Sequence, residues 1–206
     1  MNSFTLKYFR FSRLLTTIIF IVGALTVIVD FLKHLFLYYH LEFLKIPSVS
    51  AIIIILLYLM NKYLYKSQYA WNYYMIVPYI GGNYSGTLKF IYQMPNCEKI
   101  EGEKKCDVRI FQSCSIIKID CEFYYELNDE ERTYSESFAE YLEQKENKVK
   151  LYFPYRNSGI LMDDKIPEAL GFITLTYNEE IKSLKGNYFS ARNESKGGTI
   201  QVKKID

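Results

Sequence analysis

Two short segments of this 206-residue sequence combine the side chains that a nucleotide site needs. Tyr155-Arg156-Asn157 and Tyr188-Phe189-Ser190-Ala191-Arg192 each join aromatic rings, an arginine and a polar amide or hydroxyl group. A nucleotide is bound by rings that stack on its bases, by a cation at its phosphate and by polar groups at the base edges. The two segments can supply all three contacts. Composition alone favours a simpler interpretation, in which aromatic residues fill a core and arginines stand at strand ends.

Histidine-based catalysis is excluded from most of the chain. The only histidines are His34 and His40, so residues 79–206 have none for a Ser-His-Asp triad, a histidine-based zinc site or histidine acid–base catalysis. The paired glycines in this part do not form the glycine-rich P-loop that cradles nucleoside triphosphates. The sequence therefore favours binding over catalysis in residues 79–206.

Carboxylates are the remaining catalytic candidates. The adjacent pairs Asp129-Glu130 and Asp163-Asp164 lie in turn-like contexts, and we interpret them as solvated charge. Two carboxylates alone can hydrolyse a glycosidic bond, so a carboxylate-based, membrane-anchored enzyme is an alternative. Our main expectation is a protein that is not an enzyme and that has no cofactor and no metal site.

Four cysteines lie in the second part of the chain, and none of them forms a C-x-x-C pair: Cys97, Cys106, Cys114 and Cys121. This spacing does not match a zinc site. We predict free, buried thiols in a reducing compartment.

The charge of the chain divides near residue 78. Residues 1–78 hold 7 Lys and Arg against 2 Asp and Glu, a net charge of +5, whereas residues 79–206 hold 18 against 21, a net charge of −3. The sum is the +2 of the whole chain. A mildly acidic C-terminal part argues against binding to long nucleic acids, which usually needs a basic face.

Two apolar runs of sixteen uncharged residues lie in the basic part, at residues 14–29 and 46–61. As helices they are each about 24 Å long, and flanking apolar residues extend them towards the ~30 Å of a bilayer core. We predict two transmembrane helices; a buried helix pair in a soluble protein and a cleaved signal peptide are the alternatives. Basic residues outside the pair outnumber those between the runs by five to two, which predicts that both termini are cytoplasmic.

After residue 79 the sequence changes to short runs in which apolar and polar residues alternate. Val149, Leu151 and Phe153, for example, share one face of a predicted strand. The strand candidates are 86–92, 106–112, 115–127, 133–142, 148–155, 169–177, 183–190 and 198–205. The weakest is 133–142, because its second half also has helix propensity. Eight such strands predict an antiparallel barrel or sandwich, and an eight-stranded barrel can hold one small ligand.

The predicted fold is a membrane-anchored all-β protein. It has two N-terminal transmembrane helices followed by a compact antiparallel β-barrel of about eight strands. The predicted parts are a two-span transmembrane hairpin over residues 1–66, a juxtamembrane linker over 67–78 and a ligand-binding β-barrel over 79–206.

The order of several short motifs is more specific than any one of them. After the apolar runs come Gly82-Asn-Tyr84-Ser-Gly86, Ser135-x-Ser137, Phe153-x-Tyr155-x-Asn157, Gly171, Leu184-Lys-Gly186-Asn-Tyr188-Phe189-Ser190-x-Arg192 and Gly198-Thr199-Ile200. This arrangement resembles the CD-NTase-associated protein fifteen family, the two-transmembrane, β-strand-rich effectors of bacterial CBASS antiphage defence. The resemblance covers essentially the whole chain.

The resemblance implies a function. In that family a partner nucleotidyltransferase, the CD-NTase, makes a cyclic oligonucleotide when a phage infects the cell. The protein would then be a multi-pass protein of the bacterial inner membrane, and its barrel would bind a cyclic dinucleotide or oligonucleotide. Binding would cause self-association and disruption of the lipid bilayer, so that the cell dies before the phage matures. The alternative is a membrane-anchored barrel that binds a protein or another small molecule.

The motifs also indicate which residues would contact the ligand. Ten residues are candidates: Tyr84, Ser135, Ser137, Tyr155, Arg156, Asn157, Tyr188, Ser190, Arg192 and Thr199. Among these, Arg156 and Arg192 are expected to contact the phosphates.

Overall fold

The computed structural model describes residues 7–38, 48–93, 99–125, 128–145, 148–159, 169–191 and 196–205. The chain forms two compact units. The first contains residues Met1–Pro78 with Ser113–Ser115, and the second contains Tyr79–Gln112 with Ile116–Asp206. Helices make up the first unit and strands the second.

The first unit contains α1 (Phe11–Tyr38), α2 (Val49–Tyr63), a 3-10 turn η1 (Leu64–Lys66) and α3 (Gln68–Tyr74). Residues Phe11–Leu35 of α1 form a helix long and apolar enough to cross a membrane. Only 6% of its most apolar stretch is buried, unlike a core helix of a soluble protein. The structure thus agrees with the first predicted span.

The second predicted span, residues 46–61, is less clear. The described helix α2 has 15 residues, and its length of about 22 Å is short of a ~30 Å bilayer core. Ser67 caps a new helix, because its hydroxyl accepts a hydrogen bond from the Ala70 N–H at 3.4 Å. The new helix α3 is bent by 118° from α2. A second span therefore stays a prediction.

Residues 67–78, expected to be a linker, are structured within the first unit. The Arg10 N–H donates to the Tyr74 carbonyl at 2.7 Å, and the Ile76 N–H donates to the Tyr8 carbonyl at 2.8 Å. Trp71 is buried, and its indole N–H donates to the Val77 carbonyl at 2.8 Å. These bonds join the start of α1 to the segment that follows α3.

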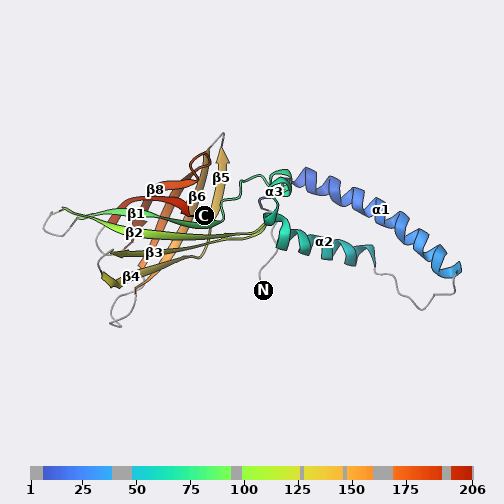
Figure 1. Ribbon diagram of the computed structural model, residues 1–206, viewed down its shortest axis with the longest axis horizontal. Helices are drawn as coiled ribbons and strands as arrows, with labels where there is room; N and C mark the ends of the chain where they lie inside the picture. The colour runs from blue at the N-terminus through green and yellow to red at the C-terminus, as the bar shows by residue number, and fades with distance from the viewer. Residues whose placement is uncertain are drawn as a thin grey trace. The chain divides into compact units, whose positions relative to one another are not determined.

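The second unit is an antiparallel β-barrel (Figure 1). Its strands are β1 (Gly82–Gln93), β2 (Lys99–Gln112), β3 (Ile117–Tyr125), β4 (Asn128–Ser137), β5 (Tyr141–Lys145), β6 (Lys148–Gly159), β7 (Ala169–Asn178), β8 (Ser183–Ser190) and β9 (Lys196–Ile205). The strand order is β4-β3-β2-β1-β9-β8-β7-β6-β5, and a further pairing of β4 with β6 closes eight of the strands into a barrel. The predicted barrel of about eight strands is confirmed.

One predicted strand divides into two. Residues 133–142 were expected to form a single strand, but β4 ends at Ser137 and β5 begins at Tyr141. Both pair with the same edge of β6: Ser137 lies opposite Tyr155, and Tyr141 lies opposite Tyr152. The break lets β4 return along β3 and close the barrel, while β5 continues along β6 outside the closed ring.

The alternation in the sequence sets which side chains fill the barrel. Leu151 and Phe153 of β6, Ile173 and Leu175 of β7, and Ile200 of β9 are fully buried. Their neighbours along each strand face outwards, as the period of two requires. The interior is therefore a packed core over much of its length.

Three of the four cysteines belong to the described residues, and all three are buried and free, as predicted: Cys106, Cys114 and Cys121. Burial raises the pKa of the Cys121 thiol to about 12, with a smaller contribution from Asp120. Cys97 lies outside the described residues.

Candidate functional site

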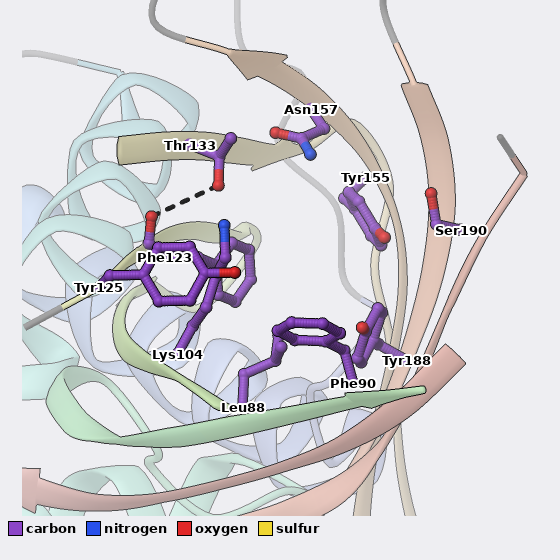
Figure 2. A pocket seen from close by; sticks show the side chains of 10 residues that line it. All are labelled: Leu88, Phe90, Lys104, Phe123, Tyr125, Thr133, Tyr155, Asn157, Tyr188 and Ser190. Atoms are coloured by element: carbon purple, nitrogen blue, oxygen red, sulfur yellow. Dashed lines mark hydrogen bonds between the residues drawn. The ribbon is translucent and has the colours of Figure 1, made fainter. Parts of the chain in front are cut away.

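A pocket with a volume of about 230 Å³ lies inside one end of the barrel (Figure 2). Its lining residues come from the C-terminal halves of β1, β3, β6 and β8 and from β2 and β4. They are Leu88, Phe90, Lys104, Phe123, Tyr125, Thr133, Tyr155, Asn157, Tyr188 and Ser190. Because adjacent strands are antiparallel, these halves meet at the barrel end opposite the start of β1 at Gly82.

Two tyrosines of the wall lie directly opposite glycines of neighbouring strands. Tyr155 is paired with Gly171, and Tyr188 with Gly198. A Cβ atom at Gly171 would collide with the Tyr155 ring, and one at Gly198 would collide with the Lys89 carbonyl and crowd the Tyr188 ring. The glycines therefore let both rings lie close to the backbone, which leaves space in the interior.

A hydrogen bond fixes the hydroxyl group of Tyr155, and burial changes the pKa of Tyr188. The Tyr155 hydroxyl donates to the Phe189 carbonyl at 3.3 Å, which joins β6 to β8 across β7. Burial raises the pKa of Tyr188, with a smaller contribution from Tyr155. Tyr188 is thus a neutral aromatic surface at physiological pH, as base stacking requires.

Lys104 supplies the positive charge of the pocket. It lies opposite Leu88, and its Nζ atom is 4.3 Å from the centroid of the Tyr125 ring. Figure 2 shows Lys104 and Tyr125 on one side of the open space, with Tyr155, Tyr188 and Phe90 on the other. The Tyr125 face helps to orient the ammonium group of Lys104 at the wall of the pocket.

Two buried polar atoms near the pocket have no hydrogen-bond partner in the described structure. They are Oδ1 of Asn157, which lines the pocket, and Oγ of Ser135. The two residues lie opposite each other where β4 pairs with β6. An unsatisfied buried acceptor costs about 1–3 kcal/mol, so a bound donor group would relieve this cost. The arrangement thus indicates a ligand with hydrogen-bond donors.

The pocket combines aromatic faces, one cation and a free acceptor, which is the chemistry of nucleotide binding. No aspartate or glutamate is among the described residues that line it. Of the carboxylate pairs singled out from the sequence, Asp163 and Asp164 lie outside the described residues, and the side chains of Asp129 and Glu130 are not described.

The structure brings four of the ten sequence-predicted site residues together in this pocket: Tyr155, Asn157, Tyr188 and Ser190. Ser135 is buried and lies opposite Asn157, but it lines a second pocket together with Tyr84. Arg192, two residues after Ser190, lies outside the described residues.

The other four lie elsewhere in the barrel. Tyr84 is fully buried, and its hydroxyl donates to the Ile80 carbonyl at 2.7 Å. The Ser137 hydroxyl accepts a hydrogen bond from the Ile119 N–H at 2.9 Å, which joins the end of β4 to β3. Arg156 and Thr199 are exposed on the outer face, and neither lines the pocket. A role for these four in ligand binding stays a prediction.

Sequence reasoning missed six lining residues: Leu88, Phe90, Lys104, Phe123, Tyr125 and Thr133. A signal for the most important one was present. The predicted strand began at Cys106, whereas β2 begins at Lys99. Continuing the alternation of Val108 and Cys106 back by one step puts Lys104 on the interior face.

The comparison with known proteins agrees with this chemistry. No curated protein matches the sequence. A family model described as the Cap15 cyclic dinucleotide receptor domain matches residues 75–204, which include every described lining residue of the pocket and all of the barrel strands except the last residue of β9. The chain therefore belongs to the Cap15 family, and the barrel is its cyclic dinucleotide receptor domain.

Proposed function

We propose that this protein is a membrane-anchored effector of CBASS antiphage defence. Its barrel binds a cyclic dinucleotide or oligonucleotide that a CD-NTase makes on infection. Binding favours self-association, which disrupts the inner membrane and kills the cell before the phage matures. The pocket that joins Lys104, aromatic faces and the free Asn157 acceptor inside a cyclic dinucleotide receptor domain is the observation that carries the proposal.

Each group of the pocket has a part in recognition. The rings of Tyr155 and Tyr188 stack on a base, and Lys104 contacts a phosphate. Asn157 Oδ1 accepts a hydrogen bond from the base edge. Arg192 stays a proposed second phosphate contact, because it follows the lining residue Ser190 by two positions.

The N-terminal helices carry out the proposed disruption of the membrane. Helix α1 spans the inner membrane, and residues 46–61 form a second span, so that both termini lie in the cytoplasm. Thr16, Thr17, Gly23 and Ala24 lie within α1, and small residues of this kind let neighbouring helices approach closely. A ligand shifts the protein towards the associated state only if it binds that state more tightly.

Neutralising Lys104 tests the pocket directly. With full-length protein in detergent micelles and a panel of cyclic di- and trinucleotides, titration calorimetry should show binding to at least one ligand. Lys104→Gln should weaken that binding by roughly 10- to 100-fold, since a hydrogen bond to a charged group contributes about 1.5–3 kcal/mol. The salt dependence of the affinity should fall as well.

Lys150→Gln is the matched control, because it removes one positive charge from the outer face of β6 at an exposed position that does not line the pocket. Its affinity should equal that of the unmodified protein. An equal or larger loss in Lys150→Gln would show that the affinity follows the net charge of the barrel and not a contact of Lys104. The absence of binding to every ligand by the unmodified protein would overturn the proposed function.

Asn157→Leu separates a recognition role from a structural one. The change removes an unsatisfied buried acceptor at similar volume, so the unliganded protein should become more stable by about 1 kcal/mol. Affinity for the cyclic nucleotide should fall at least about tenfold. Thermal unfolding followed by circular dichroism and calorimetric titration measure the two effects.

Asn187→Leu, an exposed position on β8, is the control and should change neither property. If Asn157→Leu lowers the unfolding temperature and keeps full affinity, the Asn157 amide stabilises the barrel and does not bind the ligand.

Deleting residues 1–66 tests the membrane role. The truncated protein should still bind the cyclic nucleotide but should no longer kill cells in which the ligand is made, because it lacks both proposed spans. Growth curves and ligand titration measure the two properties. Killing by the truncated protein would contradict a membrane output.

A further inference from the structure

The pocket is small for the ligand that we propose. Pockets that enclose most of a drug-sized ligand have volumes of about 300–1,000 Å³. The cavity here has about 230 Å³, yet a cyclic dinucleotide contains two bases, two riboses and two phosphates. A pocket of this volume encloses only part of such a ligand, and the rest extends out of the barrel.

The charge of the pocket also indicates that the pocket contacts only part of the ligand. Among the lining residues that the structure describes, Lys104 is the only cation. A cyclic dinucleotide carries two phosphodiester groups, each with one negative charge. The described part of the pocket therefore supplies one positive charge, so a ligand with two negative charges needs a further cation, from Arg192 or from a second chain.

An apolar surface lies on the outside of the barrel at the same end. Pro154, Phe172 and Phe189 lie opposite one another on β6, β7 and β8, and the row continues through Gly197 to Ile91 of β1. Phe172, Phe189 and Ile91 are exposed by 44%, 51% and 46%. We call Pro154, Phe172, Phe189 and Ile91 the apolar collar.

Three residues of the apolar collar are neighbours in sequence of residues that line the pocket. Ile91, Pro154 and Phe189 are each next in sequence to a residue that lines the pocket, namely Phe90, Tyr155 and Ser190. Contiguous exposed apolar surface on a soluble domain commonly marks a site of association. The collar is therefore placed to contact whatever covers the ligand that extends from the barrel.

We propose that a second copy of this chain covers it, so that one cyclic dinucleotide joins two barrels. A ring of two identical nucleotides has a two-fold axis, and two copies of one protein around that axis form a closed, self-complementary pair. Each barrel then holds one nucleotide unit, the two Lys104 side chains face the two phosphates, and the collars pack beside the ligand. This inference rests on the proposed function and specifies how ligand binding leads to association.

The stoichiometry of full-length protein in detergent micelles tests the inference. Calorimetric titration with the cyclic dinucleotide that binds should saturate at one ligand for two chains, and light scattering should show twice the protein mass per particle. A nucleoside 5′-monophosphate should bind at one per chain without this doubling, because it fills one pocket and joins nothing. Saturation at one cyclic dinucleotide per chain would overturn the inference and leave the proposed function intact, whereas no binding of any nucleotide would overturn both.

Two matched variants locate the contact. Phe172→Glu puts a charge into the collar but changes no pocket residue, so monophosphate binding should be unchanged while cyclic dinucleotide affinity falls at least about tenfold and the mass no longer doubles. Thr176→Glu, on the outer face of the same strand and away from the collar, should behave as the unmodified protein. Full association of Phe172→Glu at one ligand for two chains would exclude the collar from the contact.

Discussion

The pairing of β4 with β6 is the contact on which the rest of the molecule depends. Without it the strands would form an open sheet with two free edges. With it the sheet closes, and Ser135 and Ser137 come to lie opposite Asn157 and Tyr155. The closed ring creates the interior space that the pocket occupies. Closure and site therefore have the same structural origin.

Side chains fill the barrel interior unevenly along its length. Large apolar side chains fill much of the barrel, whereas at one end glycines let two tyrosine rings lie against the backbone and leave a cavity. Buried polar atoms without partners are rare in folded proteins, and they are expected where function outweighs stability. Ser135 and Asn157, opposite each other on β4 and β6, each have such an atom, and Asn157 lines the pocket. The chemistry of the site thus appears as a local departure from good packing.

Much of the barrel follows from the sequence, because alternation reveals each strand. The choice between a barrel and a sandwich does not, since it depends on one long-range pairing. The site was harder to predict. Tyr155, Arg156 and Asn157 look like one cluster in the sequence, but neighbours in a strand point to opposite faces, so Arg156 lies outside. The cation in the interior is Lys104 of β2. This strand begins at Lys99, before the start at Cys106 that the sequence predicted.

Hydrogen–deuterium exchange with and without the cyclic dinucleotide tests the central claim, that the ligand binds inside this end of the barrel. Backbone amides of residues 88–93, 155–159 and 188–191 should exchange more slowly when ligand is bound. Those of residues 82–86 and 108–112, at the opposite end, should be unchanged. Protection confined to the opposite end, or no protection by a ligand that binds, would contradict the account.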